Sequence, residues 1–501
     1  MMDLSYITKS LYLIKPEIII SAVIVVLVLV DLIMHKNKKL LPFISLAGLL
    51  VAGYFVADQF GLSGFASRPQ VSAGMVAVDS FGAFFKLLII LSSLFIVYFS
   101  VTSDEVAQSS DRHGEYYTLI FGMILGMFFM VSAADLILIY LSLELVSLSS
   151  YVLAGFTKNS LRNSEASLKY VIYGSVASGI MLFGISLLYG MTGTTNIYEI
   201  NIVLQNGNFN TLTMLLSGLL IFTGIGFKIS AAPFHFWTPD VYEGAPVVIT
   251  AYLSIASKAA GFALLIRFIR ITFVVGVDQN GYWHLINLID WKSIIVVISI
   301  LTMTLGNFAA LWQSNMKRLL AYSSIAHAGY ILLGLAVLSN EGLTAILIYF
   351  GIYAFMTLGA FFVVMLIANK LGTEELDDYK GLGYSSPWLG ISIAIFLVSL
   401  TGLPPTAGFI GKLYLFIALV DAKMIIVAVI ALLNSVVSLY YYIKVLKNMY
   451  LVKVEVEKPP LNVSYANIVM LIILLAPILI LGIYFTPLVN LAKYSISLLV
   501  F

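Results

Sequence analysis

Residues 211–237 read TLTMLLSGLLIFTGIGFKISAAPFHFW, an apolar run of membrane-spanning length that contains a lysine and ends in a helix-breaking sequence. Pro233 removes a helical hydrogen bond, so we expect the helix to be interrupted there. Unpaired backbone groups are tolerated at membrane depth only inside protein or beside a hydrated cavity. The stretch therefore predicts a membrane helix broken at a transport path.

A second broken span repeats this arrangement later in the chain. Pro404 and Pro405 interrupt the apolar run at 387–420, and Lys412 follows them. Interrupted spans in corresponding positions point to an internal repeat around a substrate path. A simple proline kink is the alternative for either span alone, but two breaks, each with a nearby lysine, argue against it.

The composition is that of a membrane protein. The 501 residues are 61% hydrophobic and 10% charged. A membrane helix needs roughly 20 apolar residues, and runs of this kind follow one another along the chain. We predict an all-α polytopic protein with about 14 transmembrane helices, at 17–34, 41–60, 81–101, 116–132, 134–156, 165–190, 211–237, 246–270, 292–311, 318–338, 343–369, 387–420, 424–446 and 464–491.

Composition also limits the partners. The net charge of +2 is too small, and the basic residues are too scattered, to favour nucleic acid. Cysteine is absent, which excludes disulfides and thiolate metal sites. No His and carboxylate cluster has zinc-ligand spacing, and no nucleotide-binding fingerprint is found. We therefore expect neither a metal nor a cofactor on this chain.

Basic residues in alternate loops predict the orientation, because positive loops tend to stay on the cytoplasmic side. One set has thirteen: Lys36, Lys38, Lys39, Arg112, Lys158, Arg162, Lys317, Arg318, Lys370, Lys380, Lys447, Lys453 and Lys458. The opposite set, with both tails, has seven: Lys9, Lys15, Arg68, Arg270, Lys292, Lys423 and Lys493. Both termini are therefore predicted to lie outside. The first apolar run lacks a cleavage site and is expected to be retained.

Four of the charged residues inside the predicted spans stand out, either at the centre of a span or beside a helix break. Glu144 and Lys258 are near the centres of theirs, while Lys228 precedes the first break and Lys412 follows the second. A central charge costs about 2.5 to 3.5 kcal/mol on insertion scales, so function is the better explanation. Burial moves the pKa of lysines and carboxylates in general towards the pH at which protons exchange. An inert salt bridge of Glu144 is the alternative, but one carboxylate cannot neutralise three lysines.

Three further residues are ambiguous. His327 lies mid-span and is either a proton relay or a hydrogen-bonded packing histidine. His235, at the first break, has the same two explanations. Lys169 lies near the start of its span, where it either serves the path, snorkels to the surface or pairs with Glu165 through helical spacing.

Four stretches carry a family resemblance: LSLELVSLSSY at 141–151, SEASLKY at 164–170, FKISAAPFHFWTPDVYEGAP at 227–246 and GLPPTAGFIGK at 402–412. They resemble the antiporter-like membrane subunits of respiratory complex I, and the resemblance covers nearly the whole chain. M-type members usually carry glutamate at the last position, so Lys412 favours the N type. The long lateral helix of L-type members is absent from this sequence.

The resemblance implies one integral membrane domain over 1–501 with two inverted five-helix repeats, each with a broken helix. The repeats fall at 116–270 and 292–446, between N-terminal helices at 1–110 and a C-terminal helix at 464–491. It also implies that Glu144 and Lys228 form the pair of the first half-channel. Lys258 then continues a central polar axis, and Lys412 serves the exit half-channel.

The resemblance further implies a non-redox, proton-translocating subunit of a complex I-type NAD(P)H- or ferredoxin-quinone oxidoreductase. Such a subunit works in the bacterial inner membrane or an equivalent energy-converting membrane. Its partners are antiporter-like M and L subunits, small membrane subunits and lipids, and any FMN or iron-sulfur clusters belong to partner subunits. The alternatives are a subunit of a multi-component sodium/proton antiporter and a non-pumping membrane scaffold.

Overall fold

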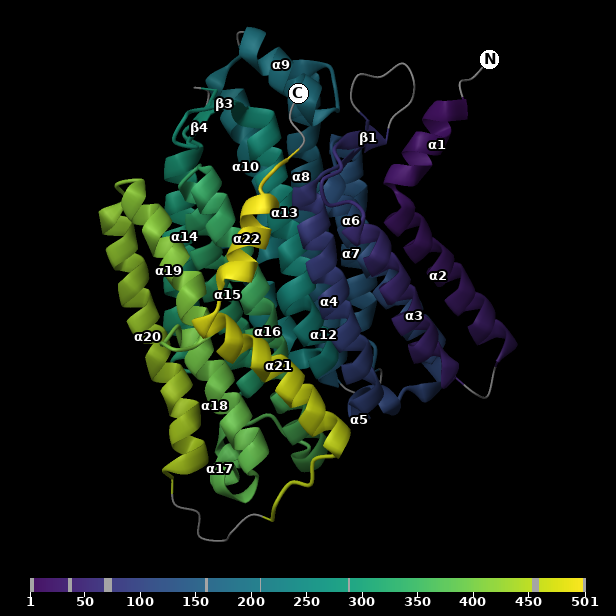
Figure 1. Cartoon of the computed structure of the whole chain (residues 1–501), viewed down its shortest axis with the longest axis vertical. Helices are drawn as coiled ribbons and strands as arrows, with labels where there is room; N and C mark the ends of the chain where they lie inside the picture. The colour runs from purple at the N-terminus through teal and green to yellow at the C-terminus, as the bar shows by residue number, and fades with distance from the viewer. Residues whose placement is uncertain are drawn as a thin grey trace.

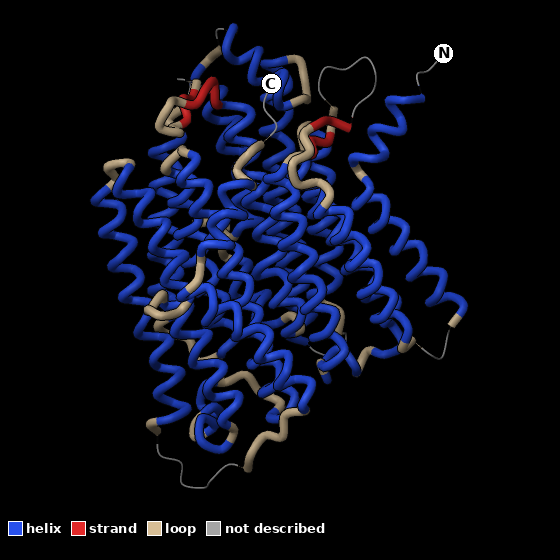
Figure 2. Tube along the Cα trace, in the orientation of Figure 1, coloured by secondary structure: helices blue, strands red, loops and turns tan. Residues whose placement is uncertain are grey.

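The computed structural model describes residues 4–34, 38–66, 74–157, 161–207, 209–286, 289–452 and 459–498. The chain forms a bundle of long helices with two short hairpins at one end (Figures 1 and 2). The all-α prediction is confirmed, because 13 helices among the described residues are long and apolar enough to cross a membrane. The hairpins pair β1 (Gly64–Ala66) with β2 (Val76–Val78) and β3 (Val274–Val277) with β4 (Trp283–Leu285).

The helices follow the predicted order along the chain. The N-terminal group is α1 (Leu4–Leu13), α2 (Lys15–Ile33), α3 (Leu40–Ala57), α4 (Ser80–Thr102) and α5 (Asp104–Ala107). The next group is α6 (His113–Ser132), α7 (Leu136–Ala154), α8 (Leu161–Thr192), α9 (Ile197–Asn206), α10 (Thr211–Ile229), α11 (Trp237–Gly244), α12 (Val247–Tyr252) and α13 (Lys258–Phe273). The last group is α14 (Trp291–Ala310), α15 (Met316–Ala336), α16 (Asn340–Leu371), α17 (Leu382–Ser385), α18 (Pro387–Thr401), α19 (Ala407–Asp421), α20 (Ile425–Tyr450), α21 (Tyr465–Ile483) and α22 (Thr486–Tyr494).

Both predicted breaks are present. The first separates α10 from α11, and the second separates α18 from α19. The α18–α19 pair supplies the fourteenth predicted span. Its two halves have 15 residues each, so neither half is counted among the 13 longer helices. The peptide bonds Ala232–Pro233 and Pro404–Pro405 within the breaks are both cis. Each broken span is the fourth of five, within α6 to α13 and within α14 to α20, and because five is an odd number the second set of spans runs upside down relative to the first.

The predicted single helix at 464–491 is wrong. The chain leaves the helix after Ile483 and begins α22 at Thr486. Pro487, in the first turn of α22, has no backbone N–H with which to continue the hydrogen bonds of α21. Pro477 lies inside α21 and is accommodated there.

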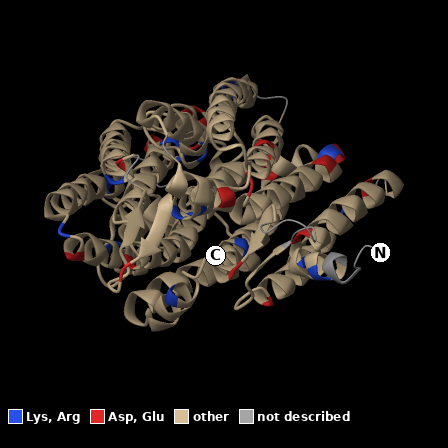
Figure 3. Cartoon of the chain, turned by 90° about the horizontal axis from the view of Figure 1, so that it is seen from above, with Lys and Arg blue, Asp and Glu red and all other residues tan. Residues whose placement is uncertain are grey.

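Burial divides the spans into central and peripheral helices. All of the most apolar stretch of Val247–Phe273 is buried, as is 94% of that stretch in α15 and in α16. The corresponding share is only 22% in α2 and 17% in α21, whose apolar side chains face outward. Seen along the bundle, acidic and basic positions are sparse among the helices (Figure 3). The central helices are therefore the ones that can keep a polar path away from lipid.

The orientation prediction rests partly on residues outside the described ranges, namely Lys36, Arg68, Lys158, Lys453 and Lys458. Among the described segments, α1 lies at one end of the bundle, and α21 and α22 run towards that same end (Figure 1). An even number of spans places the two ends of the chain on the same side of the membrane. Which end faces the cytoplasm stays a prediction.

Candidate functional site

Lys228 lies in the last turn of α10, immediately before the first break. Its side chain is buried, and its Nζ donates to Ser147 Oγ on α7 at 3.4 Å. Ser230 ends the helix in a left-handed conformation, with φ of 61°. The carbonyl end of a helix carries a partial negative charge, which favours an ammonium group at this position.

Glu144 lies on α7, one helical turn before Ser147. Because Lys228 is bonded to Ser147, Glu144 lies one turn of α7 away from the ammonium, but no ion pair joins Glu144 and Lys228 among the described residues. Glu144 Oε1 is buried and has no hydrogen-bond partner there. Glu144 and Lys228 are thus neighbours without a direct ion pair. The alternative, an inert salt bridge of Glu144, does not occur among the described residues.

Lys258 follows a π-helical turn, Leu253–Ser257, in the middle of its span. The ammonium donates to both the backbone carbonyl and the hydroxyl of Ser324 on α15, at 3.0 and 2.8 Å. It also lies 5.8 Å from the ring centroid of Tyr242 on α11, the half-helix after the first break. π-helical turns within α-helices occur frequently at functional sites.

A close approach of α13 to α10 connects this lysine with the first break. Gly261 lies one turn after Lys258, and a Cβ there would be 2.8 Å from Ile229 and 3.5 Å from Lys228 Cγ. Glycine at this position therefore allows the two lysine-bearing helices to pack together.

His327 lies one turn after Ser324 on α15 and is buried. Its Nδ1 is 2.8 Å from Tyr349 Oη and its Nε2 is 3.4 Å from Tyr442 Oη. Tyr442 in turn shares a 2.5 Å hydrogen bond with Ser323. His327 is thus hydrogen-bonded as a packing histidine would be, yet its partners are hydroxyl groups that can also pass protons.

Lys412 lies on α19, after the second break, and is buried. Its Nζ reaches back to the carbonyl of Thr401, the last residue of α18, at 2.6 Å and donates to Ser435 Oγ on α20 at 2.7 Å. Gly402 makes room for the side chain, because a Cβ there would lie 2.7 Å from Lys412 Cδ. Gly402 also has φ of 89°, a conformation that favours glycine.

His235 is placed differently. Its ring is stacked on Phe236, at 4.5 Å between centroids, and Phe236 is largely exposed on the outside of the bundle. His235 Nδ1 has no hydrogen-bond partner among the described residues. The structure therefore does not join His235 to the line of Lys228, Lys258 and His327.

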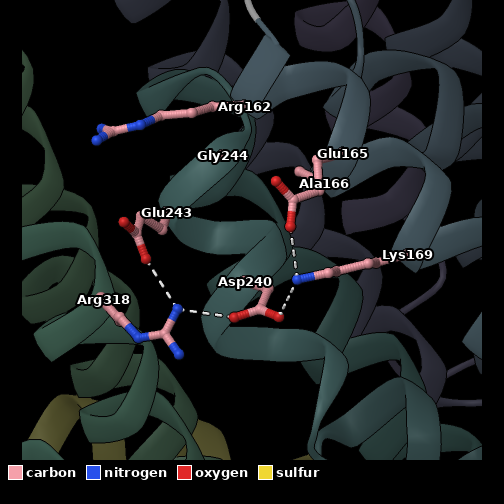
Figure 4. Close-up of a pocket in the computed structure, with 8 residues that line it drawn as sticks. All are labelled: Arg162, Glu165, Ala166, Lys169, Asp240, Glu243, Gly244 and Arg318. Atoms are coloured by element: carbon pink, nitrogen blue, oxygen red, sulfur yellow. Dashed lines mark hydrogen bonds and ion pairs between the residues drawn. The ribbon is translucent and has the colours of Figure 1, made fainter.

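Lys169 belongs to a surface cluster and not to the buried line. It forms the expected ion pair with Glu165 at 2.8 Å and a second, which the sequence did not reveal, with Asp240 at 2.7 Å. Arg318 bridges Asp240 at 2.7 Å and Glu243 at 2.8 Å. Figure 4 shows these side chains around a polar cavity of about 260 Å³. The cluster ties α8, α11 and α15 together beside the first break.

Asp240 is the centre of this cluster. Burial opposes its ionisation, but hydrogen bonds from Lys169 and Arg318 outweigh burial and hold the pKa of its carboxyl below the usual value. A lowered pKa keeps the carboxylate ionised at neutral pH, and the ion pairs are lost only on acidification below its ordinary range near about 3.9. The cluster is therefore an ionic clamp under physiological conditions.

Two buried ion pairs join residues that are far apart in the sequence and could not be predicted from it. Lys86 on α4 lies 2.6 Å from Glu17 on α2, and Arg267 on α13 binds both oxygens of Asp79 at 2.7 and 2.8 Å. Lys86 and Arg267 stand within apolar runs, so the insertion-cost argument that singled out Lys258 applies to them too. Both are paired with carboxylates, which distinguishes them from Lys228, Lys258 and Lys412.

No group of three or more metal-ligating side chains occurs among the described residues. Lys228, Lys258 and Lys412 instead donate hydrogen bonds to serine hydroxyls, and Lys258 and Lys412 also donate to backbone carbonyls. Such a series of buried cations, each with neutral partners, is suited to accepting and releasing protons in sequence.

The comparisons with known proteins concern the family and the fold of the chain. Residues 133–438 match the family model described as "NADH:quinone oxidoreductase/Mrp antiporter, TM". NADH-quinone oxidoreductase subunit N 2 of Chloroherpeton thalassium is 49% identical over 97% of this chain and 94% of its own length.

Two solved structures are similar over nearly the whole chain. A chain of respiratory complex I from Thermus thermophilus, solved with bound aureothin, is 30% identical with a TM-score of 0.77 and covers 95% of this chain and 99% of its own. A chain of the Mrp complex from Dietzia sp. DQ12-45-1b is 21% identical with a TM-score of 0.81 and covers 97% of each chain. The second likeness shows the fold alone.

Proposed function

The chain belongs to the NADH:quinone oxidoreductase/Mrp antiporter family of membrane subunits, and from this membership we propose that it conducts protons as the N-type, non-redox subunit of a complex I-type quinone oxidoreductase. The relative from Chloroherpeton thalassium bears that name at 49% identity. The buried lysines supply groups whose proton affinity is sensitive to nearby charge.

In the proposed route, Glu144 and Lys228 switch the proton load at the first break. Lys228 releases its proton when the field of Glu144 weakens and binds it when that field strengthens. Lys258, at the start of α13 in the next span, receives the proton, and His327 relays the proton towards Lys412. Lys412 delivers the proton at the second break.

One observation carries this proposal: the bond from Lys258 to Ser324 joins the first half of the chain to α15, the helix that also carries His327. Lys258 and Ser324 are both buried. The hydroxyl of Ser323, its neighbour, is bonded to Tyr442, which contacts His327. A polar connection across the centre of a membrane bundle is expensive unless it is used.

The same proposal assigns partners and location. The chain works beside antiporter-like M and L subunits, small membrane subunits and lipids in the bacterial inner membrane or its equivalent, with both termini outside. Electron transfer takes place in other subunits, which hold any FMN or iron-sulfur clusters. His235 and Lys169 have supporting roles at most, since Lys169 is held in the ionic clamp.

A subunit of a sodium/proton antiporter is the second candidate, because the Dietzia Mrp chain has the same fold. Its 21% identity supports this candidate less than the 49% relative supports the first. Iron-sulfur subunits that co-purify with the chain favour the complex I assignment, and stoichiometric antiport without them favours the antiporter.

The proposal is tested with Lys228→Met in the assembled complex. We expect proton translocation per electron pair to fall while assembly persists, because methionine keeps the packing and removes the titratable group. Lys370→Met is the matched control: Lys370 lies exposed in the last turn of α16. An assembled Lys228→Met complex with unchanged proton stoichiometry would refute the switch role and favour the non-pumping scaffold.

A further inference from the structure

A large groove lies at the surface between α3, α4 and the start of α6, on the flank formed by the N-terminal helices. Its volume is about 870 Å³, within the range of small-molecule sites. Phe43, Leu46, Val97 and Val101 are among the apolar residues that line it. None of the residues of the proposed proton route lines this groove, so it needs a separate explanation.

The polar residues of the groove share one level of the bundle. Lys38 and Lys39 precede the first residue of α3, Asp111 precedes α6 and His113 begins it. Helix ends mark the membrane surface, whereas Leu46 and Val97 lie more than a turn inside their helices. The groove therefore has a charged rim at the surface and an apolar wall beneath it, which is the order of polar and apolar parts in a phospholipid.

The charges on the rim are of both signs. Lys38 is already neutralised, since it forms an ion pair with Asp31 at 2.9 Å and also donates to the backbone carbonyl of Asp111. Within the described part of the chain, neither Lys39 nor the Asp111 carboxylate has an ion-pair partner. The groove thus offers one unpaired cation and one unpaired anion to a ligand.

The apolar wall is open to the outside of the bundle. Phe43 is 68% exposed and Val101 is 59% exposed, although both line the same hollow. Exposed apolar surface of this kind in a membrane protein is covered either by acyl chains or by another helix. The zwitterionic rim favours a lipid, because its two charges complement a headgroup that carries both a phosphate and an ammonium.

We propose that this groove binds a phospholipid with an ethanolamine headgroup. The phosphate lies at Lys39, the primary ammonium donates to Asp111, and an acyl chain covers Phe43 and Val101. A phosphatidylglycerol headgroup has no cation for Asp111. A choline headgroup carries a cation but no N–H with which to donate a hydrogen bond.

The experiment uses the complete membrane complex. It is stripped of loosely held lipid in detergent and then mixed with vesicles containing equal amounts of phosphatidylethanolamine, phosphatidylglycerol and phosphatidylcholine. The lipids retained per complex are counted by mass spectrometry. Val101→Trp fills the groove, and Val436→Trp is its matched control, because Val436 on α20 is 61% exposed but lies outside the groove.

We expect Val101→Trp to retain one phosphatidylethanolamine molecule fewer per complex than the unmodified protein, and Val436→Trp to retain the same number. Lys39→Gln, at the surface, is expected to weaken retention of this lipid about fivefold, the effect of one basic residue near a phosphate surface. Lys423→Gln, at an exposed lysine between α19 and α20, should leave retention unchanged.

Three results would overturn the proposal. One is equal lipid retention in Val101→Trp and the unmodified complex. Another is loss of phosphatidylglycerol or phosphatidylcholine in place of phosphatidylethanolamine. The third is loss of a neighbouring subunit from Val101→Trp without a change in lipid, which would mean that a protein helix occupies the groove. If Val101→Trp fails to assemble, unchanged retention in Lys39→Gln would refute the proposal by itself.

Discussion

The two helix breaks place a lysine at the carbonyl end of a half-helix by different routes. Lys228 is part of the last turn of α10, whereas Lys412 stands after its break and reaches back to the carbonyl of Thr401. In both cases the partial negative charge of a helix end favours the ammonium. Both breaks therefore stabilise a lysine ammonium at the carbonyl end of a helix. Lys228 comes before its break in the sequence, and Lys412 comes after its break.

The breaks differ in how firmly they hold the charge. Lys412 has two short hydrogen bonds, at 2.6 and 2.7 Å, while Lys228 has one at 3.4 Å and the nearby carboxylate of Glu144. A loosely bound ammonium beside a carboxylate responds to changes in charge separation. A tightly bound one responds to the geometry of the break. The comparison indicates a charge-controlled site at the first break and a geometry-controlled site at the second.

Removing the second charge should have the largest effect. We expect Lys412→Met to lower the rate of coupled proton translocation at least about tenfold. An increase of about 1.4 kcal/mol in the activation free energy of proton transfer already gives that factor. Lys444→Met is the control: Lys444 also donates to backbone carbonyls, of Leu311 and Gln313, but lies away from the buried line. Proton pumping in membrane vesicles separates the two, and equal losses would show that the effect is structural.

Gly402→Ala tests whether geometry controls the second break. A Cβ would meet Lys412 Cδ at 2.7 Å, and a left-handed conformation costs a non-glycine residue about 1 to 2 kcal/mol. We expect several-fold slower pumping and a lower thermal transition of the complex. Gly193→Ala shares the backbone strain, with φ of 73°, but has open space around it. If the two variants pump alike, strain alone explains the effect and the lysine contact is unimportant.

Glu144→Gln tests charge control at the first break. Glutamine keeps the shape and removes the field at Lys228, an interaction of about 2.4 kcal/mol if the groups stand about 7 Å apart at an effective dielectric of 20. We expect a threefold to tenfold loss of pumping, since relaxation and water screen part of that energy. Proton-to-electron ratios in reconstituted vesicles measure it. A Glu144→Gln complex with full stoichiometry would contradict the distinction between the breaks.

The smallest expected effects come from the two serine ligands. Ser435→Ala removes a 2.7 Å hydrogen-bond partner of Lys412 and should slow pumping about twofold, because a neutral hydroxyl partner contributes about 0.5 kcal/mol. Ser147→Ala removes only the 3.4 Å partner of Lys228 and should change the rate less than twofold. Pumping rates of the two variants are measured side by side, and Ser435→Ala should be the slower. If Ser147→Ala is slower instead, the first break holds its lysine more tightly than the second.

The apolar runs predicted most of the fold from the sequence. Runs of membrane length and prolines at two positions were sufficient for the helix order and both breaks. The division between α21 and α22 was missed because apolar composition continues across it, and only Pro487 marks the change.

The candidate site was predicted less completely. Lys228, Lys258 and Lys412 stood out because an isolated charge in an apolar run is expensive wherever its partners lie. The partners themselves come from distant parts of the chain: Asp240 is 71 residues from Lys169, and Asp79 is 188 residues from Arg267. Sequence spacing carries no information about such contacts. Glu17 is the first residue of the predicted span at 17–34, and that position does not predict its buried ion pair with Lys86.

The π-helical turn at Leu253–Ser257 determines which neighbours Lys258 can reach. An α-helix advances about 100° per residue, so one residue more or less in that turn rotates everything after it by about that angle. Deleting a single residue there would swing the ammonium away from Ser324 and also turn Gly261 away from α10. The π-helical turn thus fixes the rotation of α13 about its own axis. The contacts of α13 with both α10 and α15 depend on that rotation.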